Sequence, residues 1–194
     1  EFKVYENLDK KNNDRYEFIL PKLDITKKID NFTNLAGNFL IKSSNLVRSY
    51  DTNVLERINI NNLIFNSDAL ISKSGFKNNY DLIIKNVNSD ANNSSTYKED
   101  ENFYLSSLFQ FNSSFPLVKK SNEFLNIFTP KLALKISPNY TKDISQTDGN
   151  RLDVNNIYNL DRLSANNVLE GGTSLTLGND FTIFDEKNSK EIFS

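Results

Sequence analysis

The chain has 194 residues, enough for one domain, and its 23 basic and 25 acidic side chains give a formal net charge of −2. This balance argues against a basic stripe for nucleic acid and against a polybasic membrane tether. Cys and His are both absent, which excludes disulfides, most zinc sites, and Cys–His or Ser–His–Asp catalytic groups. We therefore expect no enzyme active site, no cofactor and no metal.

The first residue is Glu1, and the sequence contains no Met. No apolar stretch near the start resembles a signal peptide, and no window approaches the roughly 18 apolar residues of a transmembrane helix. We expect residues 1–194 to be one partial domain, truncated at both ends, of a larger protein.

Hydrophobic residues recur with a period of two in most of the chain, which is typical of β-strands. Several of these segments reach about ten to sixteen residues, longer than the usual five or six. A final strand is expected to begin in residues 191–194. In chain order, the other expected strands are residues 16–27, 32–47, 54–61, 76–88, 103–115, 124–137 and 168–184.

The segment 103–115 alternates most clearly. Phe103, Leu105, Phe109 and Phe111 share one face of the expected strand, and the opposite face is mostly polar. In segment 54–61, two Ile residues likewise oppose an Arg and two Asn residues. In a membrane barrel the apolar faces would meet lipid and the polar faces would line the lumen.

Strand length favours a membrane barrel over a soluble sandwich, because a tilted strand needs about 9–11 residues to cross the hydrocarbon layer. The predicted fold is all-β, namely an up-and-down antiparallel transmembrane β-barrel segment of about eight or nine strands. Aromatic residues near the expected strand ends fit a membrane girdle. These are Tyr16, Phe18, Phe103, Phe115, Phe124, Phe181 and Phe184.

Polar segments rich in Asn, Asp and Ser separate the strands, and the longest is residues 139–167. Strict alternation puts the connections 89–97 and 139–167 at the same end of the barrel, which we assign to the exterior. Shorter turns are expected at residues 9–14, 48–53, 119–122 and 185–190.

Proline and glycine interrupt several of these strands. Pro116 and Pro138 fit strand ends, whereas Pro21 and Pro130 fall inside strands and predict local breaks, because proline cannot donate to a ladder. Gly171, Gly172 and Gly178 lie within a strand pattern with no helix after them. They indicate a bulge, a bend or a close backbone approach rather than a phosphate-binding loop.

The second half of the chain carries an ordered series of short motifs. Its residues include Pro116, Pro130, Pro138, Asp153, Asn156, Tyr158, Arg162, Glu170, Gly171, Gly172 and Gly178. This series resembles the LptD family, the lipopolysaccharide-assembly proteins of the Gram-negative outer membrane. Similar proteins carry a pair of proline motifs, an Asn–aromatic loop ending in Asp-Arg or Asn-Arg, and a strand that opens on Glu-Gly-Gly or on Glu and Gly separated by one residue.

This resemblance implies transport rather than chemistry. Family members receive lipopolysaccharide from periplasmic bridge proteins and insert it into the outer leaflet, with the plug lipoprotein LptE inside the barrel. The chain would then lie in the cell outer membrane, in contact with its lipid, and residues 156–162 would cap the barrel from outside. The family's periplasmic domain and its disulfide cysteines have no counterpart in this sequence.

Three alternatives remain open. A general porin-like outer-membrane channel would share the alternation without the motif series. A soluble surface β-sandwich or adhesin would share the strands but not their length. An outer-membrane enzyme would not have a lipase-type site in this sequence, because His is absent, but the rest of the larger protein could hold one.

Overall fold

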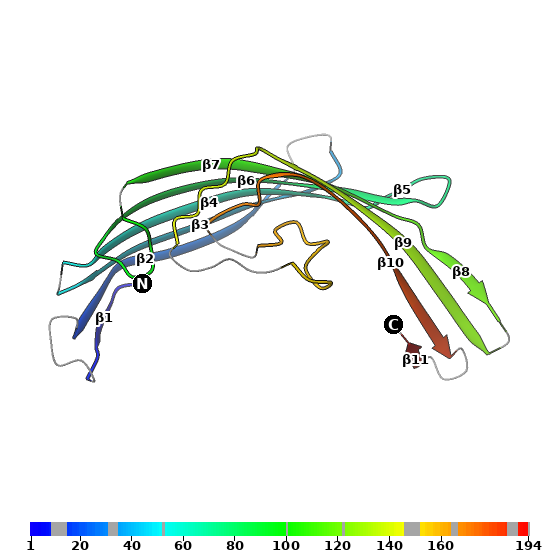
Figure 1. Ribbon diagram of the computed structural model, residues 1–194, viewed down its shortest axis with the longest axis horizontal. Helices are drawn as coiled ribbons and strands as arrows, with labels where there is room; N and C mark the ends of the chain where they lie inside the picture. The colour runs from blue at the N-terminus through cyan, green and yellow to red at the C-terminus, as the bar shows by residue number, and fades with distance from the viewer. Residues whose placement is uncertain are drawn as a thin grey trace.

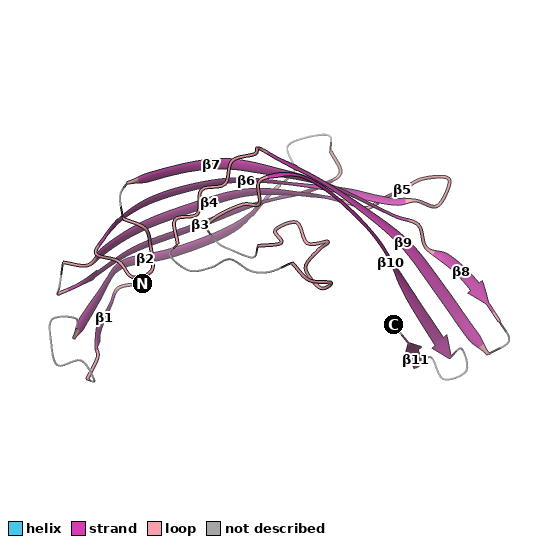
Figure 2. Ribbon diagram, in the orientation of Figure 1, coloured by secondary structure: helices cyan, strands magenta, loops and turns pink. Residues whose placement is uncertain are grey.

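The computed structural model is a single antiparallel β-sheet (Figures 1 and 2). It describes residues 1–8, 15–30, 35–51, 53–99, 101–121, 123–145, 152–163, 167–185 and 190–193. Parts of the expected turns, of strand 32–47 and of connection 139–167 lie outside these residues. Within them, the strands are β1 (Lys3–Glu6), β2 (Tyr16–Ile29), β3 (Gly37–Tyr50), β4 (Leu55–Ser67), β5 (Leu70–Ile71), β6 (Lys77–Asn92), β7 (Asn102–Ser114), β8 (Leu117–Lys120), β9 (Phe124–Ser137), β10 (Gly172–Asp185) and β11 (Lys190–Phe193).

The strands form a meander, in which each main strand pairs with the next one along the chain. The spatial order is β1-β2-β3-β4-β6-β7-β9-β10-β11, while short β5 and β8 pair at the side with β6 and β9. Among the described residues no pairing joins β1 to β11, so the sheet is open. The all-β, antiparallel part of the prediction is confirmed, including a last strand near the chain end.

Seven strands have 13 to 16 residues each, as the long alternating segments predicted. Their ends differ from the prediction in four strands. β3 starts later and runs on to Tyr50, β4 continues from the expected end at residue 61 to Ser67, β6 continues to Asn92, and β10 begins only at Gly172. Residues 89–92, expected in a turn, instead pair with β4.

Pro21, Pro116 and Pro138 mark irregularities or strand ends as predicted, whereas the break expected at Pro130 is wrong, because β9 runs through this residue with no register shift against β10. The β2–β3 register shifts between Ile19 and Lys22, on either side of Pro21. Pro116 separates β7 from β8, and Pro130 in β9 lies opposite this break, where its carbonyl accepts a hydrogen bond from the Phe115 amide at 3.1 Å. Pro138 directly follows the last residue of β9.

The sheet is arched, and the chain between β9 and β10 lies under the arch, against its concave face (Figure 1). We call residues 139–145, 152–163 and 167–171 the strap. The buried core lies between the strap and the concave face. Its two clusters are Ile58, Val87, Tyr104 and Ile144, and Ile83, Leu108 and Leu169.

Alternation in β7 holds as predicted. Phe103 and Leu105 are 64% and 56% exposed on the convex face, whereas Tyr104, Leu108 and Gln110 on the concave face are each about 1% exposed. The strap explains the difference, because it covers the concave side of this strand. A face that sequence reading marks as mostly polar is therefore the more deeply buried one.

In β4 the two faces are the reverse of the expected pattern. Ile58 lies in the concave core against Ile144 of the strap, while Asn59 and Asn61 lie on the convex face with Asn45 and Asn88 of the neighbouring strands. The two-residue period shows that a strand has two different faces. It does not show which of the two faces a distant segment of the chain will cover.

Candidate functional site on the concave face

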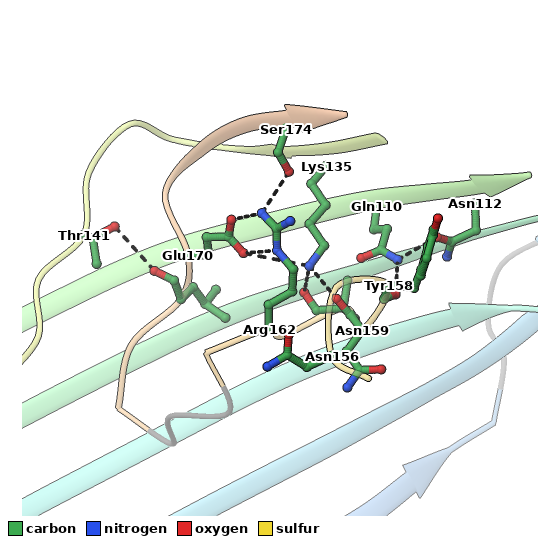
Figure 3. Close-up of polar contacts among 12 residues, drawn as sticks. Gln110, Asn112, Lys135, Thr141, Asn156, Tyr158, Asn159, Arg162, Glu170 and Ser174 are labelled. Atoms are coloured by element: carbon green, nitrogen blue, oxygen red, sulfur yellow. Dashed lines mark hydrogen bonds and ion pairs between the residues drawn. The ribbon is translucent and has the colours of Figure 1, made fainter. Parts of the chain in front are cut away.

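The strap is held to the sheet by three buried cationic side chains, and Figure 3 shows two of them, Lys135 and Arg162. Lys85 of β6 and Lys135 of β9 are each 3% exposed, and Arg162 of the strap is 4% exposed. Charges this deeply buried are costly unless they are paired and hydrogen-bonded. Each of the three has such partners.

Arg162 forms a fork-shaped pair with Glu170, which lies just before β10. Its Nε donates to Glu170 Oε2 at 2.6 Å, its Nη2 donates to Glu170 Oε1, and the same Nη2 donates to Ser174 Oγ at 2.9 Å. Burial lowers the pKa of the Arg162 guanidinium. A planar guanidinium with two carboxylate oxygens in line is geometrically specific, so this contact fixes the orientation of the strap.

Lys135 joins the strap to β9 through backbone carbonyls. Its Nζ donates to the carbonyl oxygens of Asn159 and, at 3.0 Å, Leu160, and it lies 3.9 Å from Glu170 Oε2. Glu170 therefore links Lys135 and Arg162 in one network.

Lys85 repeats this arrangement from β6. Its Nζ donates to the Val168 carbonyl at 3.2 Å and lies 4.0 Å from Asp161 Oδ2. Gln110 of β7 adds a neutral contact, because its Nε2 donates to the Tyr158 carbonyl at 2.9 Å. Four strands thus contact the strap through polar side chains.

Tyr158 and Gly178 fit together. A Cβ added at Gly178, near the middle of β10, would overlap the Tyr158 hydroxyl. The Tyr158 ring also lies 5.7 Å from Lys131 Nζ, measured to the ring centroid. The predicted close approach at Gly178 is confirmed, and its cause is the aromatic side chain of the strap.

Gly171 and Gly172 let the chain pass from the strap into β10. A Cβ at Gly171 would come within 2.6 Å of Thr141 Oγ1, and Gly172 has φ of +91°, a conformation that favours glycine. The strand expected at residues 168–184 would place Leu169 and Leu175 on one face, and this expectation is wrong. The chain bends at these glycines, so Leu169 of the strap is fully buried against the sheet and Leu175 is 60% exposed on the convex face.

Asp153 and Asn156 form a reciprocal turn within the strap. Asp153 Oδ1 accepts from the amides of Asn155 and Asn156 at 2.7 and 3.0 Å, and Asn156 Oδ1 accepts from the Asp153 amide at 2.9 Å. This pattern matches a capping box. It shapes the backbone just before Tyr158, so these two motif residues act on structure rather than on a ligand.

The structure gathers nine of the eleven motif residues at the strap. Pro116 and Pro130 are not among them, because they mark the β7–β8 break. Sequence reading did not identify Lys85, Lys135 or Gln110 as site residues. The two-residue period does put Gln110 on the polar face of segment 103–115 and Lys135 on the polar face of segment 124–137. The nine gathered residues are Pro138, Asp153, Asn156, Tyr158, Arg162, Glu170, Gly171, Gly172 and Gly178.

The position of residues 156–162 differs from the expected external cap. Contacts to Lys135, Gln110 and Gly178 hold them against the concave face instead of across the strand ends. The reason is the buried charge network, in which Lys85 and Lys135 of the sheet donate to strap carbonyls and Arg162 of the strap pairs with Glu170. Connections 89–97 and 139–167 do lie at the same end, because Tyr97 forms a bridge with Ser145.

The described residues contain no group of three or more Asp or Glu side chains placed to hold a metal ion. They also contain no helix that is long and apolar enough to span a membrane. No protein-family model and no curated protein matches the chain.

Proposed function

We propose that this chain is part of the wall of an outer-membrane β-barrel that assembles lipopolysaccharide into the outer leaflet, with the strap in the lumen. One observation carries the proposal. An arched meander of long strands exposes apolar side chains on its convex face, while its concave face holds charges that the strap satisfies.

The convex face has the apolar surface that a membrane wall requires. One row across the sheet consists of Phe39, Phe65, Leu82, Phe109 and Ile136 on five neighbouring strands. In this row Phe109 and Ile136 are exposed, whereas Phe65 is buried between the rings of Phe39 and Tyr80. On β10, Leu175 and Leu177 continue this surface at 60% and 69% exposure. Within the described residues no second sheet covers it, which favours a barrel wall over a sandwich.

The open edges of the sheet also suit a wall segment. β1 and β11 lie at the two ends of the strand order, and unpaired backbone groups are excluded from lipid. In the proposed barrel, further strands of the parent protein pair with these edges and close the wall.

The motif residues favour the lipopolysaccharide-assembly family over a general porin. Arg162, Glu170 and Gly178 come from separate motifs of the series, yet all three fix the strap on one wall. In this proposal the partners are lipopolysaccharide, the periplasmic bridge proteins and the plug lipoprotein LptE, and the protein performs no catalysis.

Depletion of the full-length protein in the source bacterium distinguishes lipopolysaccharide assembly from general porin activity. Loss of surface lipopolysaccharide supports the proposal. Unchanged lipopolysaccharide together with altered uptake of small solutes supports a porin and contradicts it.

Nitroxide labels at Leu105, Ser106, Leu108 and Phe109 of the membrane-embedded full-length protein test the wall directly. We expect lipid-soluble quenchers to reach positions 105 and 109 and not 106 and 108. Equal access at all four positions contradicts a lipid-facing convex surface, and a protein that stays monomeric in water without detergent favours the soluble sandwich.

A further inference from the structure

The convex face carries a cluster of polar side chains that apolar residues border on three sides and the Arg57–Asp90 ion pair on the fourth. We call these residues the amide cluster. They lie on three adjacent strands, two on each, and consist of Ser43, Asn45, Asn59, Asn61, Asn86 and Asn88.

These side chains form one continuous hydrogen-bond network. Asn59 is its centre: its Nδ2 donates to Asn45 Oδ1, and its Oδ1 accepts from Asn61 and Asn88 at 2.5 and 3.2 Å. Asn88 also donates to Asn86 Oδ1 at 2.9 Å. A connected amide network presents both donors and acceptors at the surface.

Apolar residues border the amide cluster on three sides. Ile25 and Leu23 lie beside it on β2, and Leu105 and Phe103 lie beside it on β7. Toward the apolar row of the sheet, the next residues are Ile41, Leu63 and Ile84. A polar cluster inside such a surface is costly in lipid unless it meets a polar partner.

A groove of about 500 Å³ opens over one row of the amide cluster. Asn45, Asn59 and Asn88 contribute to its lining, together with Arg57, Asp90 and the exposed ring of Phe103. Arg57 Nη1 lies 3.2 Å from Asp90 Oδ2, so the two charges offset each other.

The chemistry of the groove fits an uncharged, hydroxyl-rich ring. The amides and the paired charges offer alternating donors and acceptors, and the face of Phe103 can pack on the C–H groups of a sugar. A phosphate group is disfavoured, because Arg57 is already paired with Asp90 and the Glu101 carboxylate also lines the groove.

The depth of the groove points to a lipid headgroup as the source of this ring. Phe65 and Arg57 lie eight residues apart on β4, which is about 27 Å along the strand at about 3.4 Å per residue. A strand tilt of about 35–45° reduces this to about 20 Å along the membrane normal, and the apolar band of a membrane barrel is about 25 Å tall. The ring of Phe65 contacts those of Phe39 and Tyr80 at one end of this span. The Arg57–Asp90 end of the groove then lies near the opposite interface.

We propose that this groove binds the uncharged sugar headgroup of a membrane glycolipid against the amide cluster. The inference rests on the proposed membrane position of the convex face. It concerns the outer surface of the wall and is separate from the strap and the lumen.

The test uses the full-length protein in phosphatidylcholine nanodiscs that contain equal minor fractions of digalactosyldiacylglycerol and phosphatidylglycerol. Native mass spectrometry counts the lipids that stay bound. We expect wild type to retain the galactolipid in preference to phosphatidylcholine, and Asn59→Leu to reduce this retention at least tenfold. Phe103→Ala removes only an exposed ring, so it tests the groove without disturbing the network, and we expect a clear reduction there too.

Asn179→Leu is the matched control, because Asn179 is exposed on the convex face of β10, away from the groove. It should retain the galactolipid as wild type does. Equal retention by wild type, Asn59→Leu and Phe103→Ala contradicts the inference, as does preferential retention of anionic phosphatidylglycerol.

Competition by free digalactose distinguishes a lipid headgroup from a free soluble sugar as the source of the bound ring. Strong competition by the free disaccharide at equal concentration would overturn the assignment to a lipid headgroup, whereas weak competition supports it. A protein that inserts and folds but ignores the galactolipid contradicts only this inference. Failure to insert into the nanodisc contradicts the proposed function, and this inference with it.

Discussion

The concave and convex faces of the sheet both carry polar networks, but the two networks are built differently. On the concave face, Lys85, Lys135 and Arg162 are almost fully buried, and their partners are strap carbonyls and Glu170. On the convex face, half-buried neutral amides pair with one another across neighbouring strands. Regular strands can align amides side by side, whereas buried charges need an irregular segment to offer them backbone carbonyls.

The largest effect is expected from breaking the concave network at Arg162. Arg162→Ala leaves the Glu170 carboxylate without its guanidinium partner, and removing one member of a buried pair costs about 3–5 kcal/mol. Denaturant unfolding of the full-length protein measures this loss. The control is Arg57→Ala on the convex face, where the exposed pair with Asp90 contributes below about 1 kcal/mol. Equal losses at the two sites would contradict the difference between the faces.

The second-largest loss of unfolding free energy is expected at the apolar contact between the strap and the sheet. Leu169 is fully buried against Ile83 and Leu108, so Leu169→Ala should lower the free energy of unfolding by about 3 kcal/mol. Leu175→Ala makes the same change on the exposed convex face, and we expect a much smaller loss in membrane-mimetic solvent. A strap that is only loosely attached would give similar values for both variants.

A smaller effect is expected at Gly178. Gly178→Ala places a methyl group against the Tyr158 hydroxyl and should cost about 1–3 kcal/mol through overpacking. Limited proteolysis within the strap should become faster. Tyr158→Phe removes the overlapping oxygen, so the double variant should recover most of the loss. An additive result would show that the two residues are not in contact.

The smallest stability effect is expected in the amide cluster. Asn59→Leu removes three amide contacts but adds apolar surface to the convex face, which we propose meets lipid, so the net cost should be about 1 kcal/mol or less. Thermal unfolding in detergent measures it, with Asn179→Leu as the control. A loss as large as that of Arg162→Ala would mean that this network, too, is part of the buried core.

Sequence reading predicted the strands because their information is local. The two-residue period, Pro116 and Pro138 locate the long strands and several of their ends, and Gly178 signals a close approach. The strap could not be predicted in this way. Its contacts join residues far apart in the chain, such as Lys85 and Val168, and they decide that Ile58 faces the core while Asn59 faces outward. Leu169 was assigned to the wrong face, because Gly171 and Gly172 interrupt the two-residue period at the start of β10.

The distances between partners along the chain have a consequence for biogenesis. Lys85 and Val168 are 83 residues apart, and their contact requires that β6, β7 and β9 already stand in register. Loop-closure entropy opposes such a contact until those hairpins have formed. The strap therefore docks late in folding. Its protection from proteases would show that β6, β7 and β9 have already paired.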